Sequence, residues 1–197
     1  MPKGIPLTDK ELNRRRHEIF DASVNLFLTQ GFRETSMREI ADAAKMGKSS
    51  LYDYFKTKDN ILLWAVEDEL MDLTSEAQEI ANQPRPALER LRMIMRRHLE
   101  FLVERKEFYV KFSFEVQRLA MESQQRIQDK RHTYQDLIRW LVDEGIQEGS
   151  VRPVDSLLVA RTLITILSPT VFTSRPTGTP QEMLETVFDI LLNGIRA

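Results

Sequence analysis

The sequence contains no cysteine among its 197 residues, and it holds only 7 glycines and 8 prolines. The absence of cysteine excludes disulfides, thiolate catalysis and every metal site built on cysteine ligands. Scarce glycine and proline mean few turns, and long helices need fewer turns than a sheet of short strands. We therefore expect an all-α protein.

Long hydrophobic runs are also missing, since no apolar stretch approaches the roughly 20 residues that a bilayer span requires. Residues 1–12 show neither the apolar core nor the small-residue cleavage site of a secretion signal. Hydrophobic residues make up 42% of the chain and charged residues 29%, as in ordinary globular domains. We expect a cytoplasmic protein without a membrane partner.

Catalytic patterns are equally scarce. The three histidines form no HExxH motif, and the sequence has neither a phosphate-binding glycine loop nor a Gly-x-Ser-x-Gly turn. Asp129 and His132 have the spacing of one acid–histidine pair, but a di-metal site in a bundle needs two such pairs and two further carboxylates. We expect no enzyme, and neither a bound metal nor a cofactor.

The net charge of −2 conceals an uneven distribution. Residues 1–58 hold 11 Lys and Arg against 8 Asp and Glu, whereas the remainder holds 17 against 22. A basic head can approach phosphates while an acidic body keeps the molecule in solution. The asymmetry favours a nucleic-acid partner for the N-terminal part.

Helical periodicity is the strongest pattern that is present. Gly31 is placed to end a first helix, and Ser36 with Glu39 has the pattern of a capping box at the start of a second. A turn at residues 45–47 separates the second helix from a third, which is typical of a helix-turn-helix. Helices are predicted at residues 9–30, 36–44, 48–55, 57–82, 86–104, 107–120, 123–148, 154–174 and 180–195.

The third helix carries the side chains that a DNA reader needs. Lys48, Ser49 and Ser50 stand at its start, where free N–H groups attract phosphate and short or cationic side chains reach base edges. Tyr54 is expected on the outer face, and Tyr52 can pack its ring inward while its hydroxyl meets a phosphate. A solvated helix start is the alternative for the first three residues, and core packing for Tyr52.

The run from Ile19 to Leu62 resembles the N-terminal domain of the TetR family of bacterial transcriptional repressors. The matching features are Phe27 to Gly31-Phe32, Thr35-Ser36 before Ile40-Ala41, and Leu51-Tyr52 followed by Phe55 and Lys58. Two departures stand out: Lys45-Met46 replaces the usual Gly-Val, and Lys48-Ser49 a common Lys-Gly. Base preference is therefore not transferable from the family.

The resemblance implies a helix-turn-helix DNA-binding domain at residues 1–56 and a ligand-binding and dimerisation domain at residues 57–197. Lys58 matches the family's phosphate-contacting lysine, and Arg38 a position that touches backbone or base. Capping alone accounts for Ser36, and the Arg14–Arg16 run is either a minor-groove arm or a solvated face. The predicted DNA contacts are Thr35, Ser36, Arg38, Lys48, Ser49, Ser50, Tyr52, Tyr54 and Lys58.

One short recognition helix covers too few base pairs for genomic selectivity, so we expect a homodimer on a palindromic operator. The final two helices are strongly apolar and resemble the family's four-helix dimer interface; burial inside one chain is the alternative. The predicted interface residues are Leu163, Leu167, Val187 and Leu191.

The resemblance also implies a small-molecule pocket among the middle helices, although an aromatic stripe at helical spacing is more often core. The candidate lining residues are Trp64, Phe101, Phe108, Tyr109, Phe112 and Trp140. Arg96, Arg97, His98 and Arg118 could meet an anionic ligand or form an exposed charged face. The sequence thus predicts a regulator, a repressor released by an apolar or amphipathic inducer; the alternative is a helical adaptor without an inducer.

Overall fold

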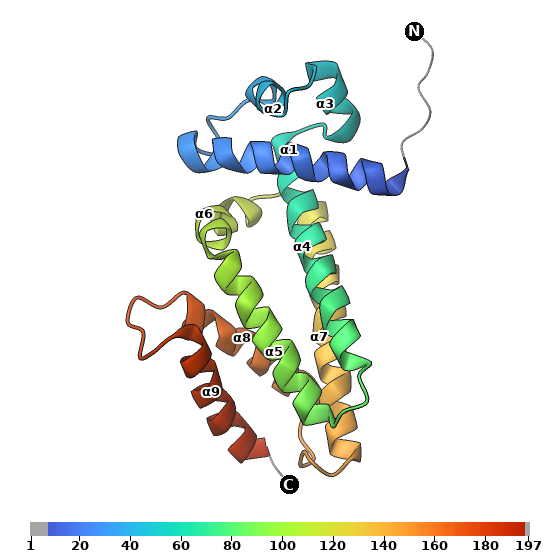
Figure 1. Cartoon of the computed structure of the whole chain (residues 1–197), viewed down its shortest axis with the longest axis vertical. Coiled ribbons are helices and arrows are strands. Elements are labelled where there is room, and N and C mark those ends of the chain that lie inside the picture. The colour runs from blue at the N-terminus through green and yellow to red at the C-terminus, as the bar shows by residue number, and fades with distance from the viewer. Residues whose placement is uncertain (1–7, 196–197) are drawn as a thin grey trace. The chain divides into compact units, whose positions relative to one another are not determined.

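The computed structural model describes residues 8–195, with side chains up to Asn193, and these residues form nine helices (Figure 1). The all-α expectation is confirmed. The helices are α1 (Asp9–Gln30), α2 (Met37–Ala43), α3 (Lys48–Tyr54), α4 (Lys58–Ala81), α5 (Ala87–Glu104), α6 (Lys106–Val116), α7 (Met121–Gln147), α8 (Ser156–Val171) and α9 (Pro180–Ile195).

The C-terminal end of helix α6 departs most from its predicted position, which was residue 120. The N–H groups of Arg118 and Leu119 donate to the carbonyl oxygens of Glu115 and Val116, three residues back. This tighter turn replaces the α-helical pattern, so the helix ends at Val116. None of the described helices is long and apolar enough to cross a membrane.

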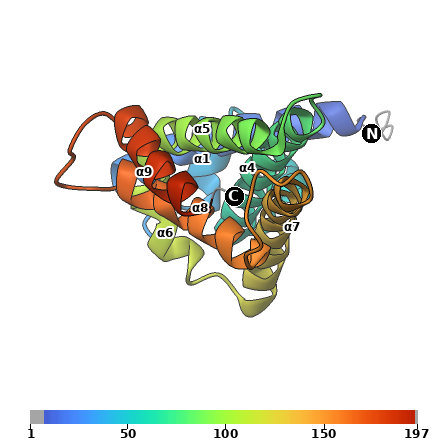
Figure 2. The same ribbon diagram turned by 90° about the horizontal axis from the view of Figure 1, so that it is seen from below.

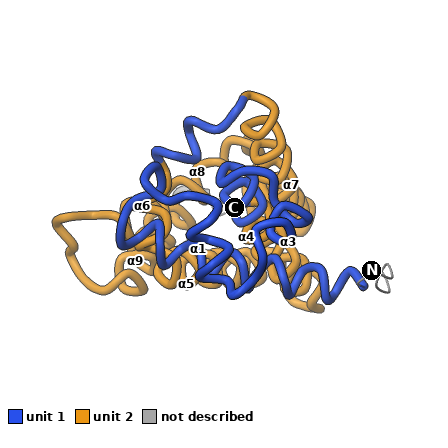
Figure 3. Tube along the Cα trace, turned by 90° about the horizontal axis from the view of Figure 1, so that it is seen from above, with its two compact units in different colours: residues 1–66, 114–120 blue, residues 67–113, 121–197 orange. Residues whose placement is uncertain are grey.

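The chain divides into two compact units (Figure 3). The head unit comprises Met1–Val66 and Phe114–Ala120, and the body unit comprises Glu67–Ser113 and Met121–Ala197. The division falls inside α4, whereas the predicted domain boundary lies between residues 56 and 57. The last residues of α6 and the short segment that follows it group with the head although they are distant in sequence, which no periodicity could indicate.

Local chemistry defines the head's helix ends. Thr8 caps α1 and Ser36 caps α2, each in a capping box with the glutamate three residues later. Gly31 follows α1 at φ 100°, where a side chain is strained. Lys45, between α2 and α3, has φ 54°, an unfavourable left-handed conformation for lysine.

One apolar core joins α1, α2, α3 and the start of α4 in the head. Ile19, Ile40 and Leu51 are fully buried there. Trp64 packs with its ring centroid 5.8 Å from that of Phe55 and 4.9 Å from that of His17. The helix-turn-helix is thus held by packing on both neighbouring helices.

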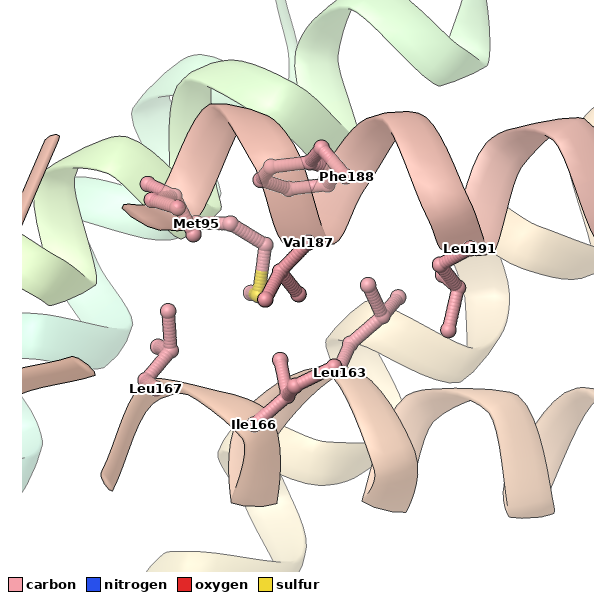
Figure 4. A pocket seen from close by; sticks show the side chains of 8 residues that line it. Met95, Leu163, Ile166, Leu167, Val187, Phe188 and Leu191 are labelled. Carbon is pink, nitrogen blue, oxygen red and sulfur yellow. The ribbon is translucent and has the colours of Figure 1, made fainter. Parts of the chain in front are cut away.

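The body unit is a helical bundle in which α5 packs on α7, α8 and α9, and α8 packs on both α7 and α9 (Figure 2). Arg92 and Arg96 of α5 pair with Glu185 of α9. Between α8 and α9, apolar side chains from both helices and Met95 of α5 point toward one another around a crevice too tight to admit water (Figure 4). This part of the α8–α9 contact is therefore dry core.

Candidate nucleic-acid interface

Helix α3 has an exposed edge and a buried edge. Lys48, Ser49 and Ser50 are exposed at its start, while Leu51 is fully buried. Gly47 precedes the helix with an extended backbone and provides no side-chain cap. The first-turn N–H groups and the three exposed side chains therefore occupy the same end of the helix.

Both tyrosines of α3 are half-buried. The Nζ atom of Lys48 lies 5.9 Å from the centroid of the Tyr52 ring, a cation–π distance. Tyr54 is less exposed than its predicted outward position suggested. Each tyrosine combines a packed ring with a partly accessible side chain, so both retain surface for a polar contact.

Lys58, the first residue of α4, contacts the connection that follows α1. Its Nζ atom donates to the carbonyl oxygens of Phe32 at 2.6 Å and Arg33 at 2.8 Å. An ammonium group has three donors, so one N–H remains beyond these two bonds. Lys58 therefore joins parts of the head and still carries a cationic donor.

The residues at the start of α2 differ in accessibility. Arg38 and Ser36 are exposed, and Ser36 exchanges hydrogen bonds with Glu39. The Thr35 side chain is turned inward: the residue is 1% exposed, and its hydroxyl donates to the Gly31 carbonyl at 2.7 Å. The structure therefore corrects the assignment of Thr35 as a DNA contact, because its side chain has no free surface.

The basic run ahead of the core stripe of α1 is part of the helix. Arg14 and Arg15 lie 3.9 and 2.7 Å from the carboxylate of Glu18, and Arg16 is half-buried above the Phe55 ring. These pairings favour the solvated-face interpretation over the minor-groove arm.

A charged cluster in the head was missed by sequence reasoning. Glu115 lies in the last turn of α6. Its carboxylate is 3.5 Å from Arg33 and 3.7 Å from Arg118. Together with Phe32, Lys58, Asp59 and Leu119, these residues line a surface cleft of about 360 Å³. The contact between Arg33 and Glu115 joins segments far apart in the chain, so local patterns carried no signal for it.

Comparison with known proteins decides what this architecture is. Residues 19–64 match the family described as bacterial regulatory proteins of the tetR family, and residues 84–195 match the tetracyclin repressor-like C-terminal domain. The chain belongs to the TetR family of bacterial transcriptional regulators. It is thus a helix-turn-helix regulator and not an enzyme.

Relatives cover nearly the whole TetR-family chain. The transcriptional repressor KstR2 of Mycobacterium tuberculosis is 29% identical over 189 residues, which span 94% of each protein. A TetR/AcrR-family regulator from Thermobifida fusca is 26% identical, with a TM-score of 0.76 over 94% of this chain and 100% of that one. AibR, solved in complex with isovaleryl coenzyme A and operator DNA, is 26% identical, with a TM-score of 0.67 over 89% and 97%.

Four of the six candidate pocket residues of this TetR-family body come together. Phe108 and Phe112 have ring centroids 4.9 Å apart, and Tyr109 lies 6.3 Å from Phe101 and 6.4 Å from Phe172. Phe101, Phe108 and Phe112 are buried, and Tyr109 is half-buried. They form an aromatic cluster that joins α5, α6 and the end of α8.

The two tryptophans do not belong to that cluster. Trp64 is packed in the head, against His17 and Phe55. Trp140 of α7 is 47% exposed, with the Arg90 guanidinium 5.8 Å from its ring. The pocket assignment is corrected at both positions, because Trp64 is half-buried against aromatic rings of the other unit and Trp140 faces solvent.

The candidate anion-binding groups already have partners. Arg97 binds Glu76 through two hydrogen bonds, Arg96 pairs with Glu185, and Arg118 lies over the Phe114 ring. His98 is buried, and its Nδ1 lies 3.0 Å from the Tyr134 hydroxyl. Burial lowers the pKa of His98 to about 4, so this imidazole is neutral near pH 7.

The predicted dimer residues separate into two groups. Leu163 and Leu167 are 1% and 0% exposed within one chain, and Val187 and Leu191 are half-buried. Leu163 and Leu167 thus belong to the core of the single body, because α8 turns them toward α9 and α5. The exposed apolar side chains of these helices include Leu158 at 60% and Ile190 at 69%, which are not among the four predicted interface residues.

Proposed function

We propose that this TetR-family regulator is a repressor that binds a palindromic operator as a homodimer and is released by a small apolar or amphipathic molecule. The observation that carries the proposal is the exposed edge Lys48–Ser50 on a recognition helix whose opposite edge, Leu51, is locked in the head core. A rigid helix with short polar and cationic side chains at its start suits major-groove readout.

The DNA contacts sort into two roles. Lys48, Ser49 and Ser50 read base edges, assisted by the hydroxyl of Tyr54. Four further residues position the head on the backbone, and of these Arg38 and Lys58 set the salt dependence of affinity because counterions leave as phosphates are neutralised. The backbone contacts are Ser36, Arg38, Tyr52 and Lys58.

Dimerisation uses the outward faces of α8 and α9. Leu158 and Ile190 present apolar surface to solvent, whereas the half-buried Val187 and Leu191 line the crevice between α8 and α9. Such a face loses its contact with water when a second copy covers it. A two-fold pair of bodies presents two heads, which matches the symmetry of a palindromic operator.

The inducer binds beside the aromatic cluster of the body. Phe101, Phe108 and Phe112 supply apolar surface, and the half-buried Tyr109 supplies a hydroxyl. A relative of known structure is described as a ketosteroid regulator, and AibR was solved with isovaleryl coenzyme A. An apolar acid carried as its coenzyme A thioester is therefore the inducer class that we propose.

The experiment that tests this function begins with duplexes selected from a random pool by the purified full chain. Affinity is then measured by fluorescence anisotropy across a salt series, and coenzyme A thioesters of short, long and steroid acids are titrated into the complex. An enriched palindrome, a steep salt slope and release by one thioester class support the proposal.

Three outcomes contradict it or part of it. Absence of DNA affinity at low salt overturns the repressor and favours the protein-binding adaptor. An enriched sequence without two-fold symmetry overturns the homodimeric mode. Release by none of the thioesters overturns the inducer class and favours a regulator that works without one.

A further inference from the structure

Glu69 is a buried acid of the body unit with incomplete hydrogen bonding. Glu69 of α4 has a side chain that is 10% exposed, and its Oε1 atom lies 3.2 Å from the Nε atom of Arg105 at the end of α5. Its Oε2 atom is buried and has no hydrogen-bond partner. A buried carboxylate oxygen without a donor is costly, so this site favours the protonated acid.

Charges of both signs act on the Glu69 carboxyl. Arg105, which is 51% exposed, is the cation that faces the carboxyl, whereas Asp68 and Asp72 of the same helix repel a negative charge there. Burial and the negative charge of Glu69 raise the pKa of the half-buried Tyr109 phenol on α6, and the cationic Arg131 of α7 lowers it. Burial is the largest influence and raises the pKa of Glu69 to about 7.

We propose that Glu69 and Arg105 form a proton-controlled tie between α4 and the junction of α5 and α6. The ionised carboxylate holds the Arg105 guanidinium. When a proton from solvent binds the carboxylate, the ion pair is lost, the neutral acid stays buried, and the half-exposed Arg105 side chain returns to water.

The position of the tie links it to DNA binding, and this step rests on the proposed function. Helix α4 continues without a break from Lys58–Val66, in the head unit, to Glu67–Ala81, in the body unit. A tie at Glu69 therefore holds the first turns of α4 within the body unit. The same helix begins in the head unit. Closing or opening the tie shifts the populations of α4 positions, and operator affinity follows them.

The first test needs no DNA. Thermal unfolding of the full chain is followed from about pH 5.5 to pH 8 for wild type, for Glu69→Gln and for the matched control Glu79→Gln, an exposed acid on the same helix. The melting temperature of Glu69→Gln should rise relative to wild type as the pH rises, because only wild type must ionise a buried acid. Glu79→Gln should run parallel to wild type.

A second variant tests the partner. Arg105→Gln removes the cation that favours the ionised form of Glu69. The pH at which Glu69 ionises in the folded chain should therefore move upward. The loss of stability relative to wild type should be larger at pH 8 than at pH 5.5. Parallel pH profiles for Glu69→Gln and wild type, or an Arg105→Gln effect independent of pH, would overturn the tie.

The last measurement uses the operator duplex selected above. Between pH 6 and pH 8, the fold-change in the wild-type dissociation constant should exceed the fold-change for Glu69→Gln by a factor of at least about three. Equal changes in both proteins overturn the link between the tie and DNA. A chain that binds no duplex at any pH overturns the repressor proposal instead, while the unfolding profiles still decide whether the tie exists.

Discussion

The Nζ atom of Lys58 donates a hydrogen bond to the carbonyl oxygen of Phe32 at 2.6 Å and lies 5.1 Å from the centroid of the same residue's ring. The first residue of α4 is thereby joined to the connection between α1 and α2. A single ammonium group serves the architecture of the head and, under the proposed function, a DNA phosphate.

Lys58→Ala should therefore change two properties. It should lower the free energy of unfolding by about 1–2 kcal/mol, because two charge-assisted hydrogen bonds are lost. It should also weaken binding to all duplexes about equally and reduce the salt slope by about 1. Chemical denaturation and anisotropy across a salt series measure both effects, with the exposed Lys10→Ala as control. A sequence-dependent loss of affinity would assign Lys58 to base readout.

Base discrimination should depend on α3. Lys48→Ala removes a cationic donor, and Tyr54→Phe removes only a hydroxyl while keeping the half-buried ring. Each should reduce discrimination between operator and single-base variants by about 1–3 kcal/mol at the contacted position. Competition binding against a library of such variants gives this value. Unchanged discrimination in both proteins would exclude direct readout by these side chains.

Lys45 should be replaceable with a gain in stability. Its φ of 54° disfavours a side chain, whereas glycine adopts this conformation readily. After the greater flexibility of an unfolded glycine is subtracted, Lys45→Gly should raise the free energy of unfolding by about 0.5–1 kcal/mol. Urea denaturation monitored by circular dichroism measures the change, and Lys45→Ala, which retains a Cβ atom, should bring no such gain.

The outer face of α9 should control association. Ile190 is 69% exposed, so Ile190→Asp should leave the single chain folded and weaken the dimer by placing a charge in the interface. Leu163→Ala should instead lower the free energy of unfolding by about 2–5 kcal/mol through a core cavity, with little effect on association. Analytical ultracentrifugation separates the two cases. A dimer unaffected by Ile190→Asp would place the interface elsewhere.

His98 should make the body sensitive to acid. Its pKa is lowered to about 4, so the unfolded chain binds the proton first and stability falls as the pH drops from about 6.5 toward 4. The loss should be on the order of 3 kcal/mol, from about 1.4 kcal/mol per pKa unit. His98→Gln should flatten this limb of the unfolding profile, and the exposed His132→Gln should not. Protonation of Glu69 raises the free energy of unfolding in part of this pH range, which is opposite to the effect of His98. Single variants are therefore needed to separate the two effects.

The positions of the helices, and the helix ends that carry a local capping pattern, were predictable because the residues that determine them are close in sequence. Ser36 and Glu39 satisfy each other across one turn, and Gly31 ends α1 where no other residue adopts the backbone easily. The family motif between Ile19 and Lys58 is equally local. These patterns sufficed for the all-α class, the helix-turn-helix and the absence of an enzyme motif.

Which face of each helix meets which neighbour was decided only in three dimensions. Periodicity marks an apolar stripe without naming its partner, so Leu163 was assigned to a second copy although it packs within one chain, and Trp64 to the body although it packs against Phe55 in the head. Thr35 is turned inward by a hydrogen bond to Gly31. Glu69 and Arg105 are 36 positions apart in the sequence. Their contact depends on how the helices of the bundle pack rather than on any local spacing.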